Sequence, residues 1–127
     1  MSKLIIDSYG WIEFFMKGPK FKFFKERIFS SAEVLLPQIV LAEVAAKFRA
    51  AGRGEECRQV LASMVQRGQL IGISPAVADL AGKILVENKK FGMGLADASI
   101  IATALLENAK IVTGDEHFKR FDFAEVV

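Results

Sequence analysis

The chain of 127 residues is poor in the residues that form disulfides and zinc sites, and it has no long hydrophobic run. Its single cysteine, Cys57, excludes an internal disulfide and a zinc site built from cysteines. Its single histidine, His117, argues against a histidine-based zinc site as well. No apolar stretch is long enough to span a membrane, and the first residues do not resemble a signal peptide. We therefore expect a cytoplasmic protein.

A strong excess of charge of either sign is also absent. The 17 basic and 15 acidic residues leave a formal net charge of +2, too small to indicate a nucleic-acid-binding protein from bulk electrostatics alone. With 52% hydrophobic and 25% charged residues, the composition predicts a compact fold without long disordered segments. No repeat, linker or low-complexity segment is visible, so we expect residues 1–127 to form a single domain.

Short apolar segments alternate with longer stretches of helical periodicity along the whole chain. The expected strands are residues 4–6, 34–36, 70–73, 110–113 and 123–127. The expected helices are residues 9–16, 20–29, 38–51, 55–67, 75–90 and 95–108, with a short helical turn at 116–120. This alternation predicts an α/β fold in which helices cover both faces of a parallel sheet.

Three aspartates stand where such folds place their functional groups, at the carboxyl ends of strands or at helix starts. Asp7 follows the first expected strand, Asp115 follows the fourth, and Asp97 lies in the opening turn of helix 95–108. Each of them alone is explained equally well as a cap or turn residue. If the first and fourth strands are neighbours, however, Asp7 and Asp115 emerge at the same edge of the sheet.

Glu43 is a fourth acid in an unusual setting. Within Ile39–Phe48, only Glu43 and Lys47 are not apolar, so a buried Glu43 would be costly unless it were paired. One interpretation is a helical i,i+4 pair with Lys47 on a solvated face, which stabilises a helix by about 0.2–0.5 kcal/mol. The other is that Glu43 points into an acidic pocket whose charge a cation neutralises.

Four carboxylates in one pocket repel one another, which raises pKa values unless a cation is bound. Oxygen ligands without histidine or cysteine select hard ions, so Mg²⁺ or Mn²⁺ is the expected metal. Such a cluster is suited to phosphodiester hydrolysis, because the ion activates water and stabilises the leaving oxygen. Ser8 and Thr113 flank the acids and are candidates for supporting roles, although both are also plausible capping or turn hydroxyls.

These residues, in this order and at this spacing, resemble the PIN-domain family, and more narrowly the VapC toxins of type II toxin–antitoxin pairs. The resemblance covers essentially the whole chain. Its most specific part is the Asp-Ala start of helix 95–108, followed by Thr-x-Asp-x-x-Phe at residues 113–118. Tyr9-Gly10 departs from the pattern, since the family more often has small or β-branched residues there.

The resemblance implies a PIN-like three-layer α/β/α fold with a central parallel sheet of four to five strands. It also implies a Mg²⁺- or Mn²⁺-dependent ribonuclease of single-stranded RNA, in which a metal-activated water attacks the phosphate and leaves a 5′-phosphate. By that likeness, Asp7, Glu43, Asp97 and Asp115 are the catalytic, metal-binding residues. A homodimer and a VapB-like antitoxin are the implied partners. A PIN-domain nuclease of RNA processing and a catalytically silent PIN-like binding domain remain alternatives.

The segment Lys17–Arg27 carries five basic residues among three phenylalanines. Lys20, Lys22 and Lys25 are therefore candidates for binding the RNA substrate, because cations hold phosphates and aromatic rings stack on bases. The same pattern also fits an amphipathic helix with a solvated basic face, or an apolar groove that receives an antitoxin helix. Glu116 and Asp79 are not expected to bind the metal directly.

Overall fold

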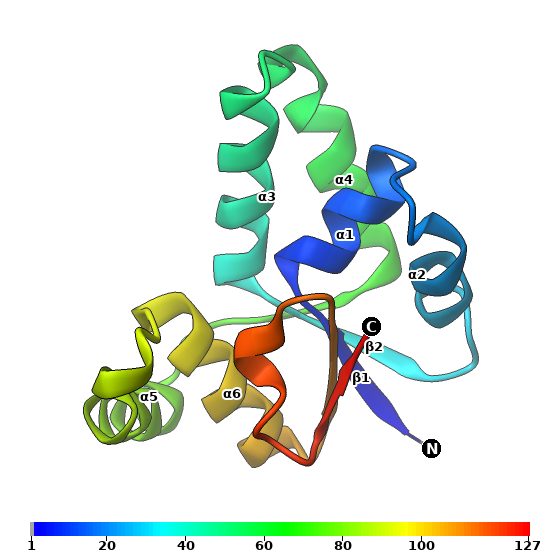
Figure 1. Cartoon of the computed structure of the whole chain (residues 1–127). Helices are drawn as coiled ribbons and strands as arrows, with labels where there is room; N and C mark the ends of the chain where they lie inside the picture. The colour runs from blue at the N-terminus through cyan, green and yellow to red at the C-terminus, as the bar shows by residue number, and fades with distance from the viewer. Residues whose placement is uncertain (1) are drawn as a thin grey trace.

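The computed structural model describes residues 2–127 and contains a five-stranded parallel sheet with the strand order β3-β2-β1-β4-β5 (Figure 1). The strands are β1 (Lys3–Ile6), β2 (Glu33–Pro37), β3 (Gln69–Ile71), β4 (Lys110–Thr113) and β5 (Ala124–Val126). The sheet confirms the predicted α/β class and the parallel strand arrangement. It also makes the first and fourth strands neighbours, with Ile5 opposite Ile111 and Ile6 opposite Val112.

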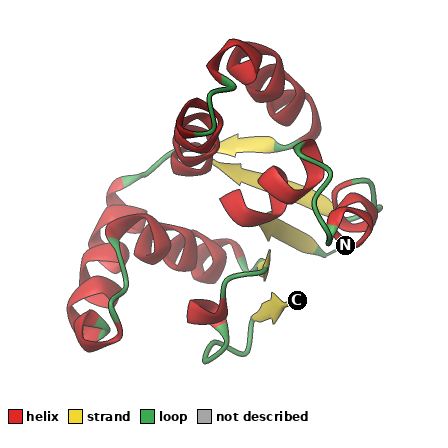
Figure 2. Cartoon of the chain, turned by 45° about the horizontal axis from the view of Figure 1, so that its top comes forward, coloured by secondary structure: helices red, strands yellow, loops and turns green. Residues whose placement is uncertain are grey.

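Six α-helices connect the strands and cover both faces of the sheet. They are α1 (Ser8–Phe15), α2 (Phe21–Ile28), α3 (Gln38–Ala50), α4 (Cys57–Arg67), α5 (Pro75–Glu87) and α6 (Leu95–Glu107). The chain moves outward from β1 to β2 and β3, and then returns across the sheet to β4. Because crossovers between parallel strands are right-handed, this reversal places α1–α4 on one face and α5 and α6 on the other (Figures 1 and 2).

The reversal of direction creates a switch point between β1 and β4. In open α/β sheets, ligands bind at the carboxyl ends of the strands beside such a point. Both α1 and α6 contact β1 and β4, so helices from opposite faces meet near this edge. The topology therefore predicts a site where Asp7 and Asp115 emerge.

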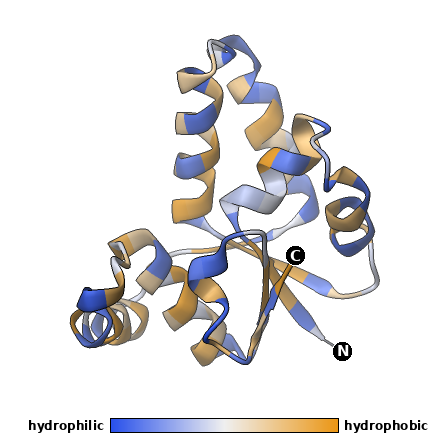
Figure 3. Cartoon of the chain, viewed as in Figure 1, coloured by the Kyte–Doolittle hydropathy of each residue, from blue (hydrophilic) through white to orange (hydrophobic). Residues whose placement is uncertain are grey.

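The hydrophobic core lies on both faces of the central strands. Ile5 and Ile6 of β1 and Ile111 and Val112 of β4 are fully buried, as expected for strands covered by helices on both sides. The helices that cover the sheet are amphipathic. In α3, for example, hydrophilic and hydrophobic bands alternate along the helix (Figure 3). This pattern allows α3 to pack on the sheet while it presents polar groups elsewhere.

Several predicted boundaries were wrong by a few residues. The expected helix 55–67 begins with a separate 3-10 turn, Gly54–Glu56, and the expected strand 70–73 is shifted to Gln69–Ile71. The expected helix 75–90 ends at Glu87, because the Asn88 side-chain amide donates to the Ile84 carbonyl at 2.8 Å and closes the last turn. A second 3-10 turn, Lys89–Phe91, follows where a helix end and a loop were expected. A third, Glu116–Phe118, replaces the expected turn 116–120.

Within residues 2–127, no helix combines the length and the apolar character that a membrane crossing needs.

Candidate active site

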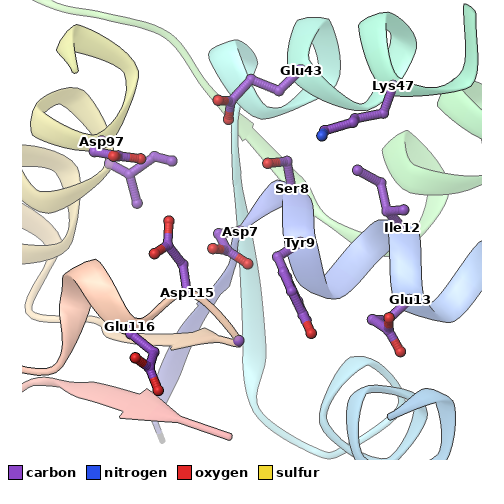
Figure 4. Close-up of a pocket in the computed structure, with 12 residues that line it drawn as sticks. Asp7, Ser8, Tyr9, Ile12, Glu13, Glu43, Lys47, Asp97, Asp115 and Glu116 are labelled. Atoms are coloured by element: carbon purple, nitrogen blue, oxygen red, sulfur yellow. The ribbon is translucent and has the colours of Figure 1, made fainter. Parts of the chain in front are cut away.

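A cavity of about 630 Å³ opens at the carboxyl ends of β1 and β4, at the switch point of the sheet. The four predicted acids all line it, and each comes from a different segment (Figure 4). Asp7 follows β1, Glu43 lies on α3, Asp97 is the third residue of α6, and Asp115 follows β4. The structure therefore brings together carboxylates that are up to 108 positions apart in the sequence.

Asp7 is the most deeply buried of these acids, with 4% of its surface exposed. Its Oδ1 accepts the Gly10 backbone N–H at 3.1 Å, so the carboxylate caps the start of α1. Burial raises the pKa of Asp7 from 3.8 to about 7, with smaller contributions from the charges of Asp115 and Glu43. Without a bound cation, this carboxyl group therefore keeps its proton to a much higher pH than an ordinary aspartate does.

Thr113, the last residue of β4, connects two of the acids. Its buried hydroxyl donates a hydrogen bond to Asp7 Oδ2, and it accepts the backbone N–H of Asp115 at 2.9 Å. Both carboxylate oxygens of Asp7 are thereby held in place, and the loop that carries Asp115 is tied to the same group. These contacts favour the supporting role over the alternative of an ordinary turn hydroxyl.

Glu43 and Asp97 face the cavity from opposite sides and are partly buried. Burial is the main cause of a raised pKa at each, and repulsion between neighbouring carboxylates adds to it. The Ser8 hydroxyl and the Lys47 charge partly counteract the shift at Glu43. Lys47 thus faces Glu43, as the helical-pair interpretation expected, but the pair lies at the cavity rather than on a remote solvated face.

Asp97 does not cap its helix through its side chain. Gly94 is the N-cap residue of α6, and among residues 2–127 no hydrogen bond to the Asp97 carboxylate is found. One turn further along α6, Ile100 is buried and also lines the cavity, which fixes the orientation of this helix face. The carboxylate of Asp97 is left free for a ligand.

Asp115 stands at the start of the turn Glu116–Phe118. Its Oδ1 accepts the backbone N–H of His117 at 2.9 Å and lies 3.2 Å from His117 Nδ1. One ligand atom from each of Asp97, Asp115 and His117 lies within 4.8 Å of the other two, which is close enough for the three residues to converge on one metal ion.

The charge of the cavity differs sharply from that of the whole chain. Six carboxylates line the cavity, together with one basic residue, Lys47. The carboxylates are Asp7, Glu13, Glu43, Asp97, Asp115 and Glu116. A divalent cation would relieve the repulsion between them, and oxygen donors in this number suit Mg²⁺ or Mn²⁺. The donor chemistry and the raised pKa values therefore both fit a metal centre.

The three predicted substrate-binding lysines do not line this cavity. Lys22 and Lys25 border a separate hollow of about 530 Å³ beside Phe21 and Phe29. The Lys20 ammonium donates to the Val127 carbonyl at 3.0 Å and lies over the ring of Tyr9, which does line the cavity.

Two acids were expected to stay out of direct metal contact. Asp79 is exposed on α5, away from the cavity, as predicted. Glu116 is exposed at the rim of the cavity and pairs with Lys119 at 3.1 Å.

Some residues at the site were not singled out from the sequence. Glu13 could have been found from its spacing, since Tyr9 and Glu13 are four residues apart and share one face of α1. Lys47 was considered only as a partner of Glu43. His117 was considered only as evidence against zinc, although its place two residues after Asp115, in a turn that the aspartate caps, could have indicated that it lies beside this acid.

Comparison with known proteins assigns a family to this arrangement. The sequence model of the PIN domain matches residues 4–124. No curated protein sequence matches. Among solved structures, VapBC2 from Rickettsia felis, bound to a DNA fragment from its promoter, is 22% identical with a TM-score of 0.79, and the match covers 98% of each chain. VapC20 from Mycobacterium tuberculosis, described as a sarcin–ricin loop cleaving toxin, is 15% identical with a TM-score of 0.82, covering 97% of this chain and 98% of that one. At these identities, the similarity establishes the fold.

Proposed function

Because the chain belongs to the PIN-domain family, we propose that it is a nuclease that uses a divalent metal ion to hydrolyse phosphodiester bonds in single-stranded RNA. The observation that carries this proposal is the convergence of Asp7, Glu43, Asp97 and Asp115 in one cavity. Gathering four mutually repulsive carboxylates in one cavity is costly, and the capping roles of Asp7 and Asp115 do not require Glu43 and Asp97 to face them. The same observation argues against a catalytically silent binding domain.

In the proposed mechanism, the four acids would hold the ion, Mg²⁺ or Mn²⁺. When bound, such an ion polarises the phosphate and lowers the pKa of water, which supplies the nucleophile. The Thr113 hydroxyl fixes Oδ2 of Asp7 and the Gly10 N–H fixes Oδ1, so this ligand is ordered before the metal arrives. Ser8 assists by interacting with Glu43. Lys47, the basic residue of the cavity lining, is positioned to hold a substrate phosphate beside the acids.

RNA is the proposed substrate and a VapB-like protein the proposed partner. The support for RNA is the structural likeness to a toxin that is described as cleaving the sarcin–ricin loop. The support for an antitoxin is that VapBC proteins of Rickettsia felis and Salmonella typhimurium have the same fold, the latter with a TM-score of 0.76 at 19% identity over 100% of this chain and 98% of that one. A homodimer stays a prediction from the family resemblance.

The proposal is tested by incubating the purified chain with a pool of cellular single-stranded RNA in Mg²⁺, in Mn²⁺ and in EDTA. Because PIN-like nucleases can be selective, new RNA ends are mapped by sequencing. We expect cleavage in either metal and none in EDTA, and a loss of about a hundredfold or more in D97N.

D79N is the matched control, because it makes the same change of charge on an exposed aspartate of α5 that lies outside the cavity. It should cleave like the unmodified chain. Cleavage that persists in EDTA, or that D97N retains in full, would contradict the proposed site.

A further inference from the structure

His117 is placed to take part in the metal site itself. Its Nδ1 lies 3.2 Å from Asp115 Oδ1, and its backbone N–H donates to the same oxygen at 2.9 Å. The backbone contact fixes the turn, so the ring is held beside the carboxylate. With 61% of its side chain exposed, the ring is accessible to solvent, next to an acid that lines the cavity.

The spacing of the donor atoms suits shared coordination. In an octahedral shell with bonds of about 2.1 Å, neighbouring ligand atoms lie about 3 Å apart and opposite ones about 4 Å apart. The separation of 3.2 Å between the His117 nitrogen and the Asp115 oxygen matches two neighbouring positions. Asp97 adds a third candidate ligand, since one ligand atom from each of Asp97, Asp115 and His117 lies within 4.8 Å of the other two.

Building on the proposed function, we infer that His117 supplies a nitrogen ligand that makes this site prefer first-row transition ions, Mn²⁺ among them, over Mg²⁺. Mg²⁺ takes oxygen ligands and gains little from an imidazole. Transition ions bind imidazole nitrogen well, and for them a mixed oxygen and nitrogen shell is ordinary. An imidazole ring at this position therefore makes the site discriminate between Mn²⁺ and Mg²⁺, whereas carboxylates alone would bind both ions.

A competing role for His117 is purely supportive, in which Nδ1–H donates to Asp115 and only orients that carboxylate. An orienting hydrogen bond would strengthen the binding of every divalent ion alike. Direct coordination would instead strengthen the binding of Mn²⁺ and leave the binding of Mg²⁺ nearly unchanged. The two roles are distinguished by metal-binding measurements that do not depend on RNA cleavage.

The experiment uses the untagged full chain with Mn²⁺ as the probe, because His117 is its only histidine and any imidazole signal must come from it. Pulsed electron paramagnetic resonance of bound Mn²⁺ should show coupling to an imidazole nitrogen. The coupling should change when histidine alone is labelled with ¹⁵N. In H117Q, where an amide can still donate to Asp115, the coupling should vanish.

Affinities are measured in parallel by titration with Mn²⁺ and by competition with Mg²⁺. H117Q should weaken Mn²⁺ binding by about tenfold, within the range typical for groups at metal sites, and leave Mg²⁺ binding within about twofold. K119Q, a change at an exposed residue of the same loop, should leave the ratio of the two affinities unchanged.

Bound Mn²⁺ without imidazole coupling, or equal weakening of both metals in H117Q, would overturn this inference while the proposed nuclease site stands. A chain that binds no Mn²⁺ at all would overturn both.

Discussion

Asp7 shows how one side chain serves folding and chemistry together. Its Oδ1 caps α1 and its Oδ2 accepts a hydrogen bond from the Thr113 hydroxyl, so both oxygens are ordered. The residue is also buried, with 4% of its surface exposed. The cost is a pKa raised to about 7, because burial disfavours the charged form. A bound cation removes that cost, which links metal binding to the ionisation of this residue.

The raised pKa of Asp7 predicts how stability changes with pH when metal is absent. Between pH 4 and 7, the folded chain holds a proton that the unfolded chain has released, so the free energy of unfolding falls as pH rises through this range. The difference between 3.8 and about 7 corresponds to a loss on the order of 4 kcal/mol, complete above pH 7.

Because D7N does not titrate, it should lose less stability over this range than the unmodified chain, keeping only the smaller falls due to Glu43 and Asp97. Urea unfolding in EDTA from pH 4.5 to 8 measures the effect. Parallel curves for the two proteins would show that Asp7 has an ordinary pKa.

Thr113 should be needed for both stability and cleavage. In T113V the shape is kept, but Asp7 loses a donor and the Asp115 N–H loses its acceptor. We expect the free energy of unfolding at pH 7 to fall by about 1–3 kcal/mol and RNA cleavage to fall with it. T113S, which keeps the hydroxyl, should restore most of both. If T113V matched the unmodified chain in urea unfolding and in cleavage, the bridging role would be refuted.

At the scale of elements, α1 and the loop after β4 pack closely against each other. A Cβ placed on Gly114 would lie 2.1 Å from Tyr9 Cε1, so the ring packs directly on the backbone that precedes Asp115. This contact explains why the chain tolerates Tyr9 at a position where a smaller residue was expected. It also links the loop that carries Asp115 to α1, the helix that begins directly after Asp7.

The fit between Tyr9 and Gly114 predicts a non-additive pair of mutations. G114A should destabilise the chain by about 1–3 kcal/mol, because the added methyl group displaces either the ring or the loop. Y9A removes the ring, so the double variant should be more stable than the sum of the single effects predicts, by about 1 kcal/mol or more. Urea unfolding of the four proteins completes the cycle. Strict additivity would show that the two positions are independent.

At the scale of the whole molecule, the pattern of apolar strands was the main basis for predicting where the site lies. Asp7 and Asp115 could be paired from the sequence because each directly follows an apolar strand, and parallel strands end at a common edge. Glu43 stood out because its helix neighbours are apolar. Asp97 gave the weakest signal, since an aspartate in a first helical turn is ordinary.

What the sequence did not reveal depends on contacts between distant segments. The ammonium of Lys20 reaches the last residue of the chain, 107 positions away, rather than the acidic cavity. Lys47 and His117 are sequence neighbours of Glu43 and Asp115, but that these two local pairs come together depends on the way α3 and the turn after β4 cross the sheet edge. Periodicity and spacing describe single elements, so they do not predict such crossings.

If these acids bring about hydrolysis by a metal-activated water, the chemical ends of the cleaved RNA record that reaction. Fragments produced in Mn²⁺ are assayed for 5′-phosphate by ligation and for cyclic phosphate by enzymatic removal. We expect 5′-phosphate and 3′-hydroxyl ends that form only when metal is present. Ends that carry a 5′-hydroxyl and a 2′,3′-cyclic phosphate, formed equally in EDTA, would contradict it, because they would show that the RNA's own 2′-hydroxyl made the attack.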